Sequence, residues 1–320
     1  MKRCPKCRSL MPEDVHLCIR CGFDSKPAAS SLIAPSNAPK LGRLRGGWLL
    51  MRESCKVLML DKELLLFPLL SGIASLFVLA SFVGGVWASG LAEQEASLGE
   101  TTAWLILFAY YFANYFVIVA FNSALVGCAM IRFRGGDPTF ADGLRVARER
   151  MPQIVAWALL AATIGTLLRI IEERVGFVGK IVTAVLGAAW TIATYFVVPV
   201  LVVEKLGPVD AAKRSAAVVK KAWGESIVSN AGIGLVVSLL TMGATIVVAV
   251  GFGVLALKTG SFVVAIIGAL AVIGVIVLGT LIGSALSSIV LSALYLYATE
   301  GKVPQAFANA GLQHAFAPKG

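Results

Sequence analysis

Four cysteines near the N-terminus have the spacing of a metal site. They form two pairs, Cys4 with Cys7 and Cys18 with Cys21, each of the Cys-x-x-Cys type. Two such pairs supply the four thiolate ligands that Zn²⁺ takes in closed tetrahedral structural sites. We therefore expect residues 1–24 to form a small zinc ribbon with these four ligands. A unit of this size cannot bury a sufficient core, so zinc binding would supply most of its folding free energy, on the order of 10 kcal/mol or more.

Other interpretations of these cysteines are a redox-active or incidental thiol cluster, which the paired spacing disfavours. His16, between the two pairs, is an alternative ligand, but four thiolates in register make it a loop residue. The second histidine, His314, has no acidic residue or cysteine near it in the sequence. No carboxylate pair, nucleophile with a base or phosphate-binding loop is recognisable, so the chain is not expected to be an enzyme.

The rest of the chain has the composition of an integral membrane protein. Hydrophobic residues make up 58% of the sequence and charged residues 14%, whereas a soluble domain averages about 25% charged residues. Long apolar runs recur, and one helical crossing of a bilayer takes roughly 17 to 25 residues. We expect six spans, at about residues 64–90, 102–131, 152–170, 179–203, 226–257 and 262–296. The last two are expected to be joined by a turn at Thr259, Gly260 and Ser261.

Basic residues are concentrated in alternate connections between these spans. The residues before Leu64, the 132–150 and 204–225 connections and the C-terminal tail together hold 24 of the 28 Lys and Arg residues. By the positive-inside rule, both termini should lie in the cytoplasm and the protein in the cell membrane. The chain does not begin with the pattern of a cleavable signal peptide, so the N-terminus is expected to be retained in the cytosol, where thiols stay reduced.

Three amphipathic segments precede the spans, one before each pair. Each segment has apolar residues three and four positions apart on one helical face and basic residues on the other. The apolar faces consist of Leu44, Trp48, Met51 and Cys55, of Phe140, Leu144, Ala147 and Met151, and of Ala212, Ala216, Val219 and Trp223. Such helices lie in the headgroup plane. The expected fold is an all-α polytopic membrane protein with three transmembrane hairpins, each preceded by an interfacial helix, plus the N-terminal zinc ribbon.

Local signals mark the beginnings of two of these helices and a linker. Thr139 with Asp142 is a capping-box pattern, and Pro208 suits the first position of a helix. Residues 25–40 contain three prolines among Ser and Ala, which is typical of a flexible linker. The linker would join the zinc ribbon to a membrane domain over residues 41–320.

Polar residues within the spans admit two interpretations. Four of them fall near one face of the second span: Tyr111, Asn114, Tyr115 and Asn122. They could line a polar path, but hydrogen bonds to neighbouring helices are the favoured interpretation. Near the end of the third span, Arg169 and Glu173 have the spacing of an ion pair on one helix, and a transported-ion site is the less favoured alternative.

Two features of the later spans concern helix geometry. Pro199 removes a backbone donor and predicts a kink near the end of the fourth span. Hydroxyl groups available to satisfy the freed backbone are those of Thr191, Thr194 and Tyr195. In the last span, Gly279, Gly283 and Ser287 form a small-residue face for close helix contact, within the bundle or, as the less favoured alternative, with another copy.

Several short stretches are distinctive beyond their composition. They are Gly47-Trp48, Asp61-Lys62-Glu63-Leu64 with Phe67-Pro68, Tyr195 to Val200, Gly207-Pro208 leading to Lys213-Arg214-Ser215, Tyr297-Ala298-Thr299, and Ala315 to Lys319. These stretches resemble an uncharacterised prokaryotic family of integral membrane proteins over roughly residues 40–319. The resemblance implies a six-span bundle and no catalytic residues. The head is similar to the zinc-ribbon modules of many bacterial membrane proteins, although Arg8 stands where such modules often have glycine.

The sequence favours a non-enzymatic anchor or scaffold whose cytosolic zinc ribbon recruits or senses a protein partner. The alternative is a transporter or permease for a lipid or small apolar solute, which predicts a cavity lined by Asn114, Asn122 or Tyr195. Nucleic-acid binding by the basic head is disfavoured, because Phe23 is its single aromatic residue and base stacking is poorly served. The basic residues of the head could equally contact anionic lipid. The expected partners are the lipid bilayer and a cytosolic protein.

Overall fold

The structure is a computed structural model that describes residues 2–3, 10–11, 32–33, 43–89, 99–221, 225–301, 303–304 and 307. In chain order the helices are α1 (Arg43–Leu60), the 3-10 helix η1 (Lys62–Leu65), α2 (Leu66–Ala88), α3 (Glu100–Phe133), α4 (Phe140–Glu149), α5 (Met151–Arg174), α6 (Gly176–Ala193), α7 (Val197–Glu204), α8 (Pro208–Lys221), α9 (Glu225–Thr259) and α10 (Phe262–Glu300). The strands are β1 (Lys2–Arg3), β2 (Leu10–Met11), β3 (Leu32–Ile33) and β4 (Val303–Pro304).

Among the described residues, six segments are long and apolar enough to cross a membrane. They are Lys62–Ala88, Glu100–Phe133, Met151–Arg174, Gly179–Glu204, Val236–Thr259 and Phe262–Glu300. The predicted multi-span helical fold is thereby confirmed. The turn between the last two spans also falls where it was predicted, because α9 ends at Thr259 and α10 begins at Phe262. Gly260 has a φ of +60°, a conformation that glycine adopts without steric cost.

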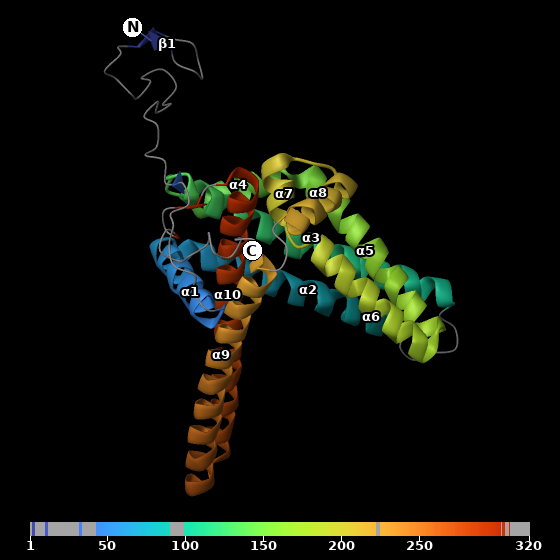
Figure 1. Ribbon diagram of the computed structural model, residues 1–320. Coiled ribbons are helices and arrows are strands. Elements are labelled where there is room, and N and C mark those ends of the chain that lie inside the picture. The colour runs from blue at the N-terminus through green and yellow to red at the C-terminus, as the bar shows by residue number, and fades with distance from the viewer. Residues whose placement is uncertain are drawn as a thin grey trace.

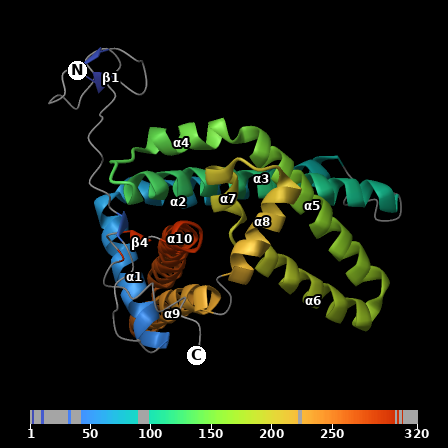
Figure 2. The same ribbon diagram turned by 45° about the horizontal axis from the view of Figure 1, so that its top comes forward.

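The spans form two arms that diverge from one end of the molecule (Figures 1 and 2). The four-helix arm consists of α2, α3, α5 and α6, with α2 against α3, α3 against α5, and α5 against α6. The two-helix arm consists of α9 and α10, which pack along each other. The end from which the arms diverge carries α4, α7 and α8 and is called the connector end below.

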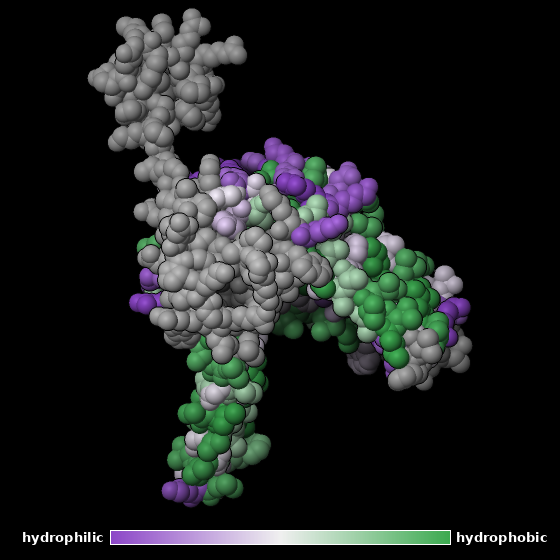
Figure 3. Space-filling view, in the orientation of Figure 1, coloured by the Kyte–Doolittle hydropathy of each residue, from purple (hydrophilic) through white to green (hydrophobic). Residues whose placement is uncertain are grey.

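Apolar side chains cover both arms (Figure 3), with hydrophilic residues at the tips of the arms and over α7 and α8. In the most apolar stretch of each span, 56% of the residues of α3 are buried inside the molecule, but none of those of α9 and 6% of those of α10. The most apolar stretches of the two-helix arm therefore bury almost nothing inside the protein. The apolar surface of this arm suits the acyl chains of a bilayer. In that environment no hydrophobic effect drives apolar side chains away from the surrounding lipid.

The buried core lies at the connector end, where both arms meet. Leu125 of α3, Ile154 of α5, Leu201 of α7 and Ile289 of α10 are fully buried there. Apart from Gly268, the buried residues of α10 all lie between Ala285 and Ala298. The arms therefore touch at one end of α10, and the remainder of that helix contacts α9.

Glycine allows α4 to pack closely on this core. A Cβ atom at Gly143 would overlap the ring of Phe67, lie 2.8 Å from Cys128 Sγ and lie 3.0 Å from the carbonyl oxygen of Ala124. The ring of Phe67 stacks on Phe140, the first residue of α4, with centroids 4.9 Å apart. Because glycine has no side chain, α4 can lie directly against α2 and α3 at position 143.

The three predicted amphipathic segments are helices α1, α4 and α8. The Thr139–Asp142 capping box is present, and Pro208 is the first residue of α8, as predicted. The predicted apolar faces were only partly right. Leu144 is exposed, whereas Gly143 and Ala147 are buried.

The buried face of α8 also differs from the predicted face and is rotated about the helix axis relative to it. It is formed by Ala211, Ser215, Val218 and Val219, and the predicted members Ala212 and Ala216 are half-buried. The physical reason is that α8 packs against α5, α6, α7 and α10, so its inner face is set by protein contacts. Side chains of Leu44, Trp48 and Trp223 lie outside the described residues.

Two short antiparallel strand pairs involve the terminal regions. β1 pairs with β2, so that Arg3 lies opposite Leu10, and β3 pairs with β4, so that Ile33 lies opposite Val303. β3 falls inside the predicted flexible linker, so two of that linker's residues are paired with a C-terminal segment. The predicted ligands Cys4, Cys7, Cys18 and Cys21, together with His16 and His314, lie outside the described residues.

The close approach of α4 yields a stability prediction. Gly143→Ala should destabilise the protein by about 1–3 kcal/mol, because the added methyl group overlaps neighbouring atoms. The matched control is Gly187→Ala in α6, where a Cβ atom meets nothing within 4 Å. The measurement is thermal unfolding in detergent micelles. A loss for Gly143→Ala no larger than that for Gly187→Ala would contradict the packing described here.

Candidate functional site

The connector end contains two ionic centres, of which the first joins η1 to α3. The Nε atom of Arg132 donates to Asp61 Oδ2 at 2.6 Å, and its Nη2 atom contacts both Asp61 Oδ1 and Asp137 Oδ1. The Asp61 side chain is 5% exposed and that of Arg132 is 23% exposed. A two-point contact between a guanidinium and a carboxylate fixes orientation as well as distance. The centre therefore sets the angle at which the first span leaves α1.

The same region fixes the beginning of α4. Glu63 Oε2 accepts a hydrogen bond from the backbone N–H of Phe140 at 2.7 Å. Both Oγ1 and the backbone N–H of Thr139 donate to Asp142 Oδ2, at 2.7 and 3.0 Å. These bonds favour the ionised carboxylate, so they hold the pKa of Asp142 below its ordinary value. Side chains thus satisfy the free N–H groups at this helix end.

The second centre joins the two arms. The Nε atom of Arg214 on α8 lies 2.8 and 2.9 Å from the two carboxylate oxygens of Glu204 at the end of α7. The hydroxyl of Tyr295 on α10 donates to Glu204 Oε1 at 2.6 Å. Tyr295 is 1% exposed. The hydrogen bond to Glu204 raises the pKa of Arg214 above its ordinary value, so this guanidinium stays charged.

The fourth span is interrupted beside this centre, between the end of α6 at Ala193 and the start of α7 at Val197. The predicted kink is present, and it precedes Pro199, which cannot donate to the carbonyl four residues earlier. Two of the hydroxyls that were predicted to satisfy backbone groups freed at the kink have other partners. Those of Thr191 and Thr194 donate to the carbonyl oxygens of Gly187 and Trp190 in α6. The free N–H of Phe196 is instead bonded by Ser215 Oγ of α8 at 2.9 Å.

Neither centre has the composition of a catalytic or metal site. The carboxylates of Asp61 and Glu204 are both engaged by arginine. In the same part of the chain, no group of three or more His, Cys, Asp or Glu residues could hold a metal ion. Burial raises the pKa of the Cys55 thiol, which keeps it protonated at neutral pH. The geometry is that of a structural clamp.

Three of the polar residues predicted within the second span have described surroundings on α3 and α5. The Nδ2 atom of Asn114 donates to the hydroxyl of Tyr110 at 3.3 Å, and its Oδ1 atom is buried without a hydrogen-bond partner. Tyr111 and Tyr115 lie near Gly165 of α5, which is a helix contact. The hydrogen bond of Asn114 lies within α3, and the approach of Tyr111 and Tyr115 to α5 is a packing contact. The predicted hydrogen bonds to neighbouring helices and the alternative of a polar path therefore both stay predictions.

The predicted ion pair of the third span is present. The Nε atom of Arg169 lies 2.9 Å from Glu173 Oε1, and Nη1 lies 3.4 Å from Glu172 Oε2. Both partners are about half exposed. At the same end of the arm, Arg174 pairs with Glu100 of α3. These charges are therefore paired with one another at the tip of the arm.

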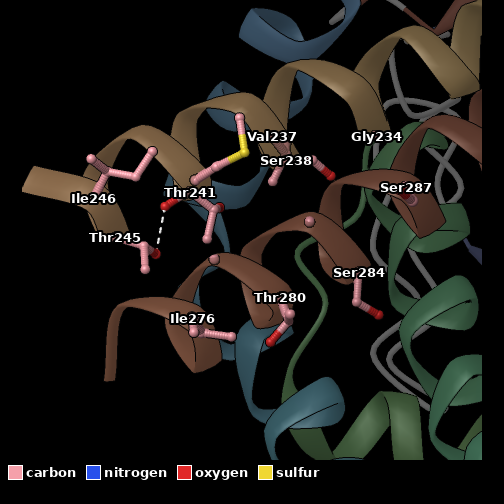
Figure 4. Close-up of a pocket in the computed structure, with 13 residues that line it drawn as sticks. Gly234, Val237, Ser238, Thr241, Thr245, Ile246, Ile276, Thr280, Ser284 and Ser287 are labelled. Atoms are coloured by element: carbon pink, nitrogen blue, oxygen red, sulfur yellow. Dashed lines mark hydrogen bonds between the residues drawn. The ribbon is translucent and has the colours of Figure 1, made fainter. Parts of the chain in front are cut away.

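A groove of about 550 Å³ runs between α9 and α10 (Figure 4). Small residues let the helices approach here, since Gly279 lies against Thr241 and a Cβ atom at Gly283 would lie 3.1 Å from Val237 Cγ1. The face predicted from Gly279 and Gly283 is thus used within the chain. Several hydroxyls along the groove are bonded to their own helix, as in Thr245 to Thr241 O at 2.7 Å.

Comparison with known proteins identifies a family. A family model described as a family of unknown function, DUF6159, matches residues 101–305, well over half of the sequence. The chain belongs to this family. No match was found among curated proteins. The match begins at α3 and includes Arg132, Glu204, Arg214 and Tyr295, whereas the cysteine pairs and Asp61 precede it. The predicted membership of an uncharacterised family is confirmed.

Both ionic centres were missed from the sequence alone. Arg132 and Arg214 were counted there only as topology signals, and Asp61 and Tyr295 were assigned no role. One signal was available, because Asp61 and Glu204 are single carboxylates at the ends of long apolar runs, where an unpaired acid is costly. Asp61 and Arg132 are 71 residues apart in sequence, and Glu204 and Tyr295 are 91 residues apart. No local sequence pattern specifies contacts over such separations.

The first centre can be tested by a double-mutant cycle. Asp61→Asn and Arg132→Gln should each cost about 2–4 kcal/mol, and the double variant should cost less than their sum by about 1–3 kcal/mol. The reason is that Arg132→Gln leaves the buried Asp61 carboxylate without its cation, and Asp61→Asn leaves Arg132 with Asp137 as its remaining acidic partner. The control cycle uses Arg169→Gln and Glu173→Gln, an exposed pair whose coupling should stay below about 1 kcal/mol. For each cycle, unfolding in mixed micelles measures the free energies of unfolding of wild type, the two single variants and the double variant. Equal couplings in the two cycles would refute the clamp.

The cap of α4 gives a pH-dependent prediction. Thr139→Ala should cost about 1 kcal/mol at pH 7, because it removes the side-chain cap and a donor to Asp142. The folded-state pKa of Asp142 is lowered, so its ionised form stabilises the fold above the unfolded value of about 3.9, and this contribution is lost as the pH falls through the lower folded-state pKa. The stability difference between wild type and variant should therefore shrink below about pH 4. A difference that stays constant from pH 7 to pH 3 would argue against this role.

Proposed function

We propose that this protein is a non-enzymatic membrane scaffold. Six spans hold it in the cell membrane as three hairpins, each preceded by an interfacial helix, with both termini in the cytoplasm. The connector end faces the cytosol and forms a rigid platform. The N-terminal zinc ribbon, held by Cys4, Cys7, Cys18 and Cys21, recruits a cytosolic protein partner.

The observation that carries this proposal is the clamped connector end. Three arginines there are engaged with partners on other elements: Arg132 with Asp61, Arg214 with Glu204, and Arg150 with the carbonyl of Val202 at 2.9 Å. Side chains that are engaged in this way hold helices in fixed positions. A platform is what a membrane protein needs if its task is to hold a partner at the surface.

The charges at the two ends support the orientation. Ten Lys and Arg residues lie in the 132–150 and 204–221 connections at the connector end, whereas the opposite ends of the described spans hold four: Arg169, Arg174, Lys180 and Lys258. Arg169 and Arg174 are compensated there by acidic partners. The excess of basic charge at the connector end is the pattern that the positive-inside rule assigns to the cytoplasm.

The short strand pair near the N-terminus supports the ribbon. β1 ends at Arg3 and β2 begins at Leu10, so the connection between two paired strands carries Cys4 and Cys7. An antiparallel pair brings the two ends of such a connection together, as a two-cysteine turn around one metal ion requires. The second pair of cysteines would complete the four-ligand shell.

The test compares wild type with a variant in which the four predicted ligands are changed to serine. Purified wild type should contain about one zinc per chain by elemental analysis, and the variant none. Affinity capture from membranes after cross-linking should recover a cytosolic protein with wild type and lose it with the variant. Cys55→Ser is the matched control and should keep both zinc and partner. Capture of the same proteins by wild type and the four-serine variant would refute recruitment by the ribbon.

A further inference from the structure

The outward face of α1 changes from basic to apolar as it approaches the first span. Arg52, Lys56 and Met59 follow one another at offsets of four and three, so they share a helical face, and Leu60 adjoins it. Met59 is 65% exposed and Leu60 is 72% exposed. The inner face of the same helix is buried through Met51, Ser54, Val57 and Leu58. The exposed apolar residues are therefore on the side that faces away from the protein.

Two of the three acidic residues of this segment are buried, and the third is held by a backbone hydrogen bond. Glu53 is 8% exposed and bonds Lys56 at 2.8 Å, and Asp61 is buried against Arg132. Glu63 is exposed, but its Oε2 atom accepts from the N–H of Phe140. By contrast, Arg52 and Lys62 are exposed, and neither has an ion pair in the part of the chain that the structure describes. The outward charge of the segment is therefore positive.

The position of the segment along the membrane axis is fixed by the first span. That span begins at Lys62, and its early residues Leu66 and Leu69 are exposed apolar side chains. Met59 and Leu60 thus lie where the chain enters the bilayer, at the boundary between acyl chains and headgroups. Long basic side chains at such a boundary extend their charge to the headgroup level while their stems stay in apolar surroundings.

We propose that residues 52–66, the α1–α2 elbow, bind the headgroups of anionic phospholipids. Met59, Leu60 and Leu66 contact the acyl chains, and the cationic groups of Arg52 and Lys62 bind the phosphate or a second negative group of the headgroup. Charge complementarity selects anionic over zwitterionic lipid, since Lys and Arg near an anionic surface each strengthen binding by about fivefold. This proposal does not depend on the zinc ribbon or on its partner.

The test titrates full-length protein in detergent with phosphatidylglycerol or phosphatidylcholine and counts bound lipids by native mass spectrometry. Wild type should bind phosphatidylglycerol at least about tenfold more tightly than phosphatidylcholine. Arg52→Gln with Lys62→Gln should weaken phosphatidylglycerol binding by about 10- to 30-fold and leave phosphatidylcholine binding unchanged, because two fivefold contributions are lost. Neither side chain has a described ion-pair partner, so the melting temperature should stay close to that of wild type.

The matched control is Lys180→Gln with Lys258→Gln, two exposed cations at the opposite ends of the spans. It should change phosphatidylglycerol binding by less than about twofold. The proposal is overturned if the elbow variant binds phosphatidylglycerol as wild type does, if the control variant loses binding to the same extent, or if binding of both lipids falls together. It is also overturned if the variant changes only the mass of a protein dimer, since a second copy would then occupy the elbow.

Discussion

The two arms of this protein meet only near the connector end, and the hydrogen-bonded group of Glu204, Arg214 and Tyr295 lies at their junction. Glu204 ends the fourth span, Arg214 belongs to α8, and Tyr295 belongs to the last span. In lipid, apolar surfaces gain little from leaving the solvent, so packing and polar contacts must hold helices together. Together with the packing of α10 on α3 and of α1 on α9, this junction places the two-helix arm relative to the four-helix arm.

Polar contacts between helices also hold the rest of the connector end together. Ser215 satisfies the N–H of Phe196 where the fourth span is broken, and Glu63 satisfies the N–H of Phe140 at the start of α4. Backbone groups released at a break would be expensive if left unpaired beside a membrane. At these two interruptions the freed backbone group is therefore satisfied by a side chain from a neighbouring helix. This matching makes the connector end rigid while the arms expose apolar surface to lipid.

Features that depend on neighbours in sequence were predictable. The Thr139–Asp142 cap, the turn at Gly260 and the six apolar spans all follow from residue type and spacing within a few positions. Features that depend on contact between distant segments were not. The buried face of α4 is centred on Gly143 and not on Leu144, because the fit of α4 against Phe67 and Ala124 decides it. Tyr295 is one aromatic residue in a long apolar run, and its role appears only when Glu204 is placed against it.

The junction of Glu204, Arg214 and Tyr295 holds the angle between the two arms. This angle can be measured directly by pulsed electron spin resonance on protein in nanodiscs, with labels introduced as unnatural amino acids at Leu257 of α9 and Val175 beside α5, both exposed at the tips. Wild type should give one narrow distance distribution. Glu204→Gln combined with Tyr295→Phe should broaden it while the helical content stays the same. An equally narrow and unshifted distribution in that variant would contradict the claim that this junction holds the two arms together.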